Sequence, residues 1–211
     1  MTQLADWIAV EAIRFISVYP KRKLFHSLVS CVLSQKISFN ASRAIRAKLF
    51  TLLGTSDITA KSLCNVSPEQ LYAIGINTNT VEIIRQLLLL HLQFDLDRDF
   101  TADEVNNILN HINNIPGIGP WTIKAVKIMT QSDNVFLFED KYIRARMSEV
   151  FNCVLMSAAE AEKYSDKFIY NHDNVRYDVR IWVSYLFWCI KPAATQKLKN
   201  MIPLEADDLI L

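Results

Sequence analysis

Asp140 is the residue of this sequence whose position is best suited to chemistry. It follows the run Val-Phe-Leu-Phe-Glu at 135–139 and directly precedes a predicted helix over 141–151. A carboxylate at this point can accept hydrogen bonds from the first backbone N–H groups of the helix, as an N-cap does. The same carboxylate can stabilise positive charge that develops on a bound substrate. The two roles do not exclude each other, and Glu139 offers the same chemistry one residue earlier.

A second candidate is the segment 114–122, Asn-Ile-Pro-Gly-Ile-Gly-Pro-Trp-Thr, which holds two of the four glycines in the chain. We expect Gly117 and Gly119 to form a tight turn with positive φ angles. Ile115 and Ile118 would anchor this turn on the core. The N–H groups of such a turn, with those of the following helix N-terminus, can bind a phosphate without contacting a base. The alternative is an ordinary turn between two helices.

The elements that must position these residues are predicted to be helices. Glycine is scarce, and several segments carry helix-start signals, such as the capping box that begins at Thr101. The predicted helices cover 3–18, 24–35, 40–53, 60–64, 68–74, 78–94, 102–113, 121–132, 141–151, 158–170, 178–190 and 193–200. Strands are expected only as fragments, for example at 135–137.

The distribution of charge is more informative than its sum. The net charge is +1, but the stretch from Lys21 to Lys48 contains seven Lys and Arg residues and no acidic residue. A one-sided basic surface of this kind suits a groove that binds phosphates, and ordinary solvated helix faces are the alternative. The four cysteines are widely spaced without a CxxC pair, so no metal site is expected.

Four segments of the chain resemble one family, in the same order. The segment 114–122 resembles the helix-hairpin-helix signature of DNA glycosylases, which is LPGIGxWTA in their alkylation-repair branch. Upstream, 32–38 resembles the family's LSQQIS turn. Downstream, 135–144 resembles the segment around its catalytic aspartate, and 180–188 resembles its RxxAxxYLW helix. The matches cover roughly residues 28–190 and are nearest to the 3-methyladenine DNA glycosylase II branch.

The resemblance implies that Asp140 is the catalytic carboxylate, 21 residues after Gly119. Cleavage of an N-glycosidic bond builds positive charge on the sugar, and the base must first leave the stack. The resemblance also implies DNA contacts from the hairpin and from the turn after the predicted helix over 24–35. There, Lys36 stands where relatives have leucine or glutamine. The residues assigned to DNA binding are Gly117, Ile118, Gly119, Thr122, Gln35 and Lys36.

Aromatic residues are expected to form the base pocket, because an alkylated purine is electron-poor and often cationic. The resemblance points to Trp121, Trp188, Phe138 and Tyr142, with core packing as the alternative for each. Trp121 also stands where bifunctional members of the superfamily carry a nucleophilic lysine. The resemblance therefore implies base removal without a lyase step.

The sequence thus predicts an all-α, two-lobed helix-hairpin-helix glycosylase fold with a central DNA-binding cleft. One lobe would comprise residues 25–133, and the other 1–24 with 134–211. The predicted enzyme is an intracellular monomer that acts on double-stranded DNA with an alkylated purine. It needs no cofactor beyond at most a monovalent cation in the hairpin. Two alternatives stay open: a glycosylase for oxidised, deaminated or mismatched bases, and a non-catalytic helix-hairpin-helix DNA-binding protein.

Overall fold

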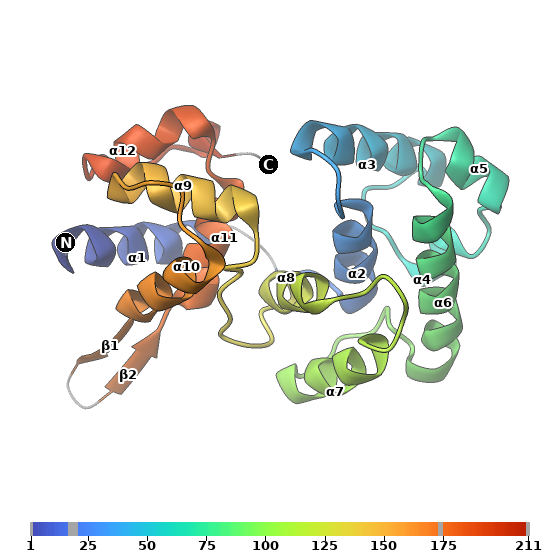
Figure 1. The fold of residues 1–211 in the computed structure, drawn as a ribbon. Helices are drawn as coiled ribbons and strands as arrows, with labels where there is room; N and C mark the ends of the chain where they lie inside the picture. The colour runs from blue at the N-terminus through green and yellow to red at the C-terminus, as the bar shows by residue number, and fades with distance from the viewer. Residues whose placement is uncertain (1, 17–20, 173–174, 210–211) are drawn as a thin grey trace. The chain divides into compact units, whose positions relative to one another are not determined.

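The computed structural model describes residues 2–16, 21–172 and 175–209. Its contacts divide the chain into two compact units (Figure 1). The central unit is Lys21–Ser132, and the terminal unit combines Met1–Pro20 with Asp133–Leu211. The predicted lobe boundaries fall at 24/25 and 133/134, within a few residues of this division.

The central unit consists of seven helices in its described residues. They are α2 (Leu24–Leu33), α3 (Phe39–Leu53), α4 (Ala60–Leu63), α5 (Pro68–Ala73), α6 (Thr78–Phe94), α7 (Ala102–Ile112) and α8 (Pro120–Thr130). Every residue of α2 is buried, because this helix packs against α3, α6 and α8 (Figure 1). Side-chain caps at several helix starts explain why the starts were predictable: Thr59, Ser67 and Thr101 each form a capping box.

The terminal unit is built around α11 (Arg180–Cys189), which packs against α1 (Thr2–Ile16) and α9 (Lys141–Phe151). The unit also contains α10 (Ala158–Ser165), α12 (Thr195–Lys199) and three short 3-10 turns, η1 (Asp166–Phe168), η2 (Pro192–Ala194) and η3 (Ala206–Asp208). Phe25, Phe168 and Phe187 are among the largest fully buried side chains, Phe25 in the central unit and the other two in this one. None of the described helices is long and apolar enough to cross a membrane.

The predicted helix over 158–170 is too long. The helix α10 ends at Ser165, and the chain continues through η1 into the antiparallel hairpin of β1 (Ile169–His172) and β2 (Val175–Asp178). Phe168 is fully buried, and its carbonyl accepts a hydrogen bond from the N–H of Val179. These contacts turn the chain out of the helix. The strand fragment expected at 135–137 is irregular backbone instead.

Candidate functional site

The hairpin between α7 and α8 requires glycine at position 117. Gly117 has φ +93°, in the left-handed region that L side chains rarely adopt. A Cβ atom there would also lie 2.7 Å from Cδ1 of Ile83. Both the backbone angle and the lack of space therefore disfavour a side chain at this position.

Gly119 differs from the expectation of a positive φ. It is the N-cap of α8 with extended backbone, φ −125° and ψ −177°, and no atom lies within 4 Å of an added Cβ. Within the described protein neither backbone angle nor packing demands glycine here. The open space is consistent with a partner that approaches the backbone closely.

The hairpin presents unpaired backbone donors. Among the described residues, the N–H groups of Gly117 and Gly119 donate no hydrogen bond and belong to exposed or half-buried residues, whereas Thr122 is buried. Ile118 is different: its side chain is buried, and its N–H donates to the carbonyl of Ile115 at 3.0 Å. Ile118 therefore anchors the turn. The free donors lie at the positive end of α8, an arrangement that binds anions such as phosphate.

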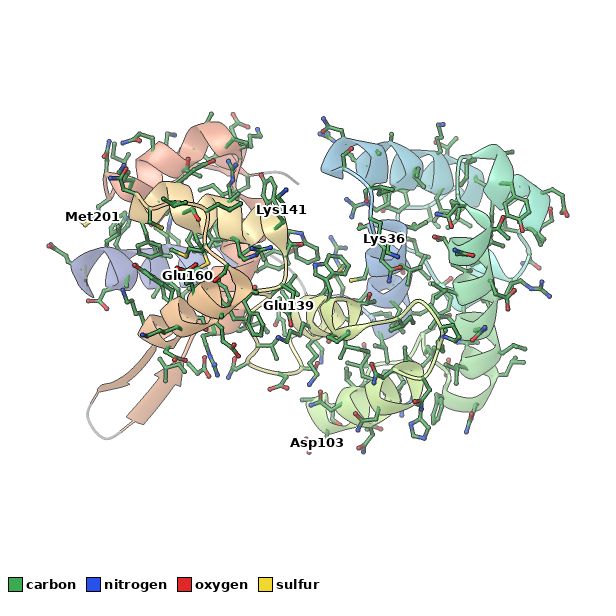
Figure 2. All side chains as sticks on the ribbon, in the orientation of Figure 1. Lys36, Asp103, Glu139, Lys141, Glu160 and Met201 are labelled. Carbon is green, nitrogen blue, oxygen red and sulfur yellow. The ribbon has the colours of Figure 1, made fainter. Side chains whose placement is uncertain are left out.

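Gln35 holds the turn after α2 against this hairpin. Its side-chain amide donates to the carbonyl of Gly117 at 2.9 Å and to Oγ1 of Thr122 at 2.7 Å. Both amide hydrogens are thus used within the central unit. The next residue, Lys36, has φ +57° and is exposed; Figure 2 labels it beside α2. Of the two, only Lys36 is exposed, and Gln35 holds the hairpin in place.

Asp140 is the N-cap of α9, as its place in the sequence predicted. Its Oδ1 accepts hydrogen bonds from the N–H of Tyr142 at 2.8 Å and of Ile143 at 3.1 Å. The carboxylate is half-buried, and its neighbours Glu139 and Lys141 mark the start of the helix in Figure 2. Two backbone donors on one oxygen fix the orientation of the carboxylate group.

Sequence reasoning missed the contacts that hold the chain on the two sides of Asp140. The N–H of Leu137 donates to Oγ of Ser184 in α11 at 3.0 Å, and both residues are fully buried. The hydroxyl of Tyr142 donates to the carbonyl of Ile190 at 2.8 Å. A serine within an apolar helix was the only signal available for the first contact.

The four aromatic residues assigned to the base pocket are half-buried. Phe138, Tyr142 and Trp188 belong to the terminal unit, and Trp121 to the central unit. Tyr142 is engaged beyond its hydroxyl, because the guanidinium of Arg146 lies 5.0 Å from its ring centroid. Burial raises the pKa of the Tyr142 phenol, so this hydroxyl remains a donor at neutral pH.

The described residues contain no group of three or more His, Cys, Asp or Glu side chains that could hold a metal ion. The four cysteines are free thiols. Cys31 is buried, which raises the pKa of its thiol to about 12, so it is not a reactive thiolate.

Comparison with known proteins identifies the fold. No family model and no curated protein sequence matches the chain. Several solved structures are similar, among them the following three. The 3-methyladenine DNA glycosylase from Archaeoglobus fulgidus has TM-score 0.60 and 20% identity over 79% of this chain. The 3-methyladenine DNA glycosylase of Schizosaccharomyces pombe, in complex with abasic DNA, has TM-score 0.62 and 17% identity over 81%. The DNA-3-methyladenine glycosidase from Bacillus halodurans has TM-score 0.56 and 20% identity over 92%.

The chain spans 59% of the Archaeoglobus protein, 81% of the Schizosaccharomyces protein and 88% of the Bacillus protein. At these identities the likeness establishes the fold. The chain has the helical fold of the 3-methyladenine DNA glycosylases, which confirms the all-α helix-hairpin-helix fold predicted from the sequence.

Proposed function

We propose that the protein is a DNA glycosylase of base excision repair that hydrolyses the N-glycosidic bond of alkylated purines, of the 3-methyladenine and 7-methylguanine type. The observation that carries this proposal is Asp140. In a chain with the glycosylase fold, a carboxylate stands 21 residues after the hairpin Gly119, as the N-cap of α9 with its orientation fixed by two backbone N–H groups. A residue that served only as a helix cap would not need this fixed distance in sequence from the hairpin.

The proposed reaction is carried out on a base flipped out of the duplex, since the bond to its sugar is hidden in the stack. As the base departs with the electron pair of the N-glycosidic bond, positive charge develops on the sugar. The Asp140 carboxylate stabilises this charge and orients the water whose oxygen bonds to C1′. The water proton is lost, and the products are free base and an abasic site. We invoke no metal or organic cofactor.

DNA binding in this proposal starts at the hairpin. The free N–H groups of Gly117 and Gly119 would hold one phosphate of double-stranded DNA, and Lys36 would contact the duplex beside it. The fold-related Schizosaccharomyces protein was solved in complex with abasic DNA. We propose that this protein acts inside the cell as a monomer on damaged duplexes.

The base pocket is proposed to use the aromatic side chains Trp188, Phe138 and Tyr142 of the terminal unit, and Trp121 of the central unit is a separate candidate for contacting the base. Electron-rich rings bind a cationic methylated purine more strongly than a normal base. Trp121 occupies the place of the lyase lysine in bifunctional relatives, so we propose that the strand stays intact after base removal.

The test is single-turnover base release from duplexes that each carry one lesion, measured before and after hot alkali. We expect release of 3-methyladenine or 7-methylguanine, with strand breaks only after alkali. Strand breaks without alkali would show a lyase step. Release of only an oxidised or deaminated base would contradict the proposed alkylated substrate and favour a glycosylase for those bases.

The variant that tests the mechanism is Asp140→Asn, which keeps the cap acceptor and removes the charge. We expect base release to fall at least about 100-fold, since one electrostatic contact in a transition state is worth that much. Asp103→Asn is the matched control, because it removes an exposed acidic charge from the first turn of α7 (Figure 2). Wild-type activity in Asp140→Asn would contradict the mechanism, and no release by the wild type from any lesion would favour a role in DNA binding alone.

A further inference from the structure

Ser184 is a polar residue in a place where packing alone would favour an apolar one. It is fully buried in α11, whose other buried residues are Ile181, Val183, Leu186 and Phe187. A hydroxyl in such surroundings destabilises the protein unless it is hydrogen-bonded. Ser184 has its partner in the N–H of Leu137, 3.0 Å away and 47 residues earlier in the chain.

This contact is directly connected to Asp140. The carbonyl of Leu137 accepts a hydrogen bond from the N–H of Asp140 at 3.1 Å. The peptide groups on the two sides of Leu137 are therefore tied to Ser184 on one side and to Asp140 on the other.

The helix that carries Ser184 also holds the other side of the carboxylate. Tyr142 donates its N–H to Oδ1 of Asp140, and its hydroxyl donates to the carbonyl of Ile190 immediately after α11. Asp140 consequently lies between two anchor points, one in the middle of α11 at Ser184 and one immediately after its last turn at Ile190. Ser184 is the anchor on the irregular segment, where no helical hydrogen bonds maintain the backbone.

We propose that Ser184 is a positioning residue for Asp140: its hydroxyl holds Leu137 in place and thereby sets where the carboxylate stands. The inference rests on the proposed function for the part that concerns catalysis. Without the hydroxyl, the buried N–H of Leu137 has no hydrogen-bond partner. Because an unsatisfied buried donor is unfavourable, we expect the segment to shift to a position in which this N–H is hydrogen-bonded. A displacement of about 1 Å of a reacting group can lower a rate by about 100-fold.

The first test compares Ser184→Ala with Ser148→Ala. Ser148 is the matched control because its buried hydroxyl also accepts a loop N–H, that of Met156 at 2.9 Å, in the second half of α9. We expect both variants to lose similar thermal stability. Only Ser184→Ala should lower single-turnover base release, by about 10- to 100-fold, with duplex affinity unchanged. Wild-type release by a folded Ser184→Ala, or an equal loss in Ser148→Ala, would overturn the proposal.

The second test is the coupling between Ser184 and Asp140. In an Asp140→Asn background the carboxylate no longer contributes, so Ser184→Ala should cause no further loss of base release. Losses that multiply would show that Ser184 acts independently of Asp140 and would refute the positioning role. If Ser184→Ala does not fold, Ser184→Cys keeps the side-chain size with a poor acceptor, and the same expectation applies.

Hydrogen exchange at the amides of Leu137 and Asp140 gives a readout that does not depend on activity. We expect lower protection of both amides in Ser184→Ala and wild-type protection in Ser148→Ala. Unchanged protection would overturn the proposal even in an inactive protein. Failure of the proposed function looks different: the wild type itself then releases no base, whatever residue stands at 184.

Discussion

The two hairpin glycines allow a sharp prediction, because substitution by alanine should affect protein stability at one position and DNA binding at the other. Gly117→Ala should destabilise the central unit, whereas Gly119→Ala should leave its stability nearly unchanged and weaken DNA binding. The contrast arises because Gly117 has φ +93° and a Cβ added there would meet the side chain of Ile83, while Gly119 is extended and a Cβ added there would meet no atom within 4 Å.

The magnitudes follow from these two environments. An alanine in the left-handed region costs about 1 kcal/mol, and moving the Ile83 side chain out of its rotamer costs roughly another 1 kcal/mol. We therefore expect Gly117→Ala to lower the free energy of unfolding by about 2 kcal/mol. At Gly119, alanine is a poorer N-cap than glycine by roughly 0.5 kcal/mol, and the reduced freedom of the unfolded chain offsets about as much.

The binding effect of Gly119→Ala comes from its new methyl group, which would stand where the proposed phosphate approaches the N–H groups. Loss of one hydrogen bond to a charged group weakens duplex binding by about tenfold. Urea unfolding and duplex titration at one fixed salt concentration measure the two quantities. Wild-type affinity in Gly119→Ala would refute the phosphate site, and a stability loss equal to that of Gly117→Ala would refute the structural distinction.

Two further predictions concern other residues of the central unit. His26 is buried and its Nδ1 accepts the N–H of Ile58 at 3.2 Å; burial lowers its pKa, so the unfolded chain binds the proton more readily. The free energy of unfolding should therefore fall as pH drops below about 6.5, and His26→Asn should flatten this dependence; an unchanged slope would contradict the assignment. The charged groups that act on His26 are Arg22, Arg46 and Asp57. Lys36→Gly should raise the free energy of unfolding by up to about 1 kcal/mol, because glycine adopts φ +57° without strain. The slope of log affinity against log salt concentration for duplex binding should decrease by the equivalent of about one phosphate contact. An unchanged salt slope would exclude Lys36 from the DNA interface.

The prediction for α9 succeeded because its start is decided locally. The helix covers Lys141–Phe151, the predicted range, and Asp140 caps it through N–H groups only two and three residues away. The prediction for α10 failed for the opposite reason. Nothing in the sequence near Ser165 ends a helix, and the end is imposed by the burial of Phe168 and by the pairing of β1 with β2.

The same distinction applies to the site. The hairpin and Asp140 could be located from the sequence, since turn glycines and N-caps act over a few residues and leave a readable pattern. The positive φ expected at Gly119 was wrong, because the neighbouring turn is completed by Gly117 alone. The partners of Gln35 were also unpredictable, since the hydrogen bonds of its side-chain amide join residues more than 80 positions apart in the sequence.

By itself, the sequence determined where most helices start, the turn glycine at 117 and the carboxylate that begins α9. Each of these depends on hydrogen bonds and backbone preferences within about four residues. Only the tertiary structure decided which side chains hold them: Gln35 against the hairpin, and Ser184 against the segment before Asp140. Such anchors depend on packing between distant segments, where a serine or a glutamine in the sequence does not indicate its partner.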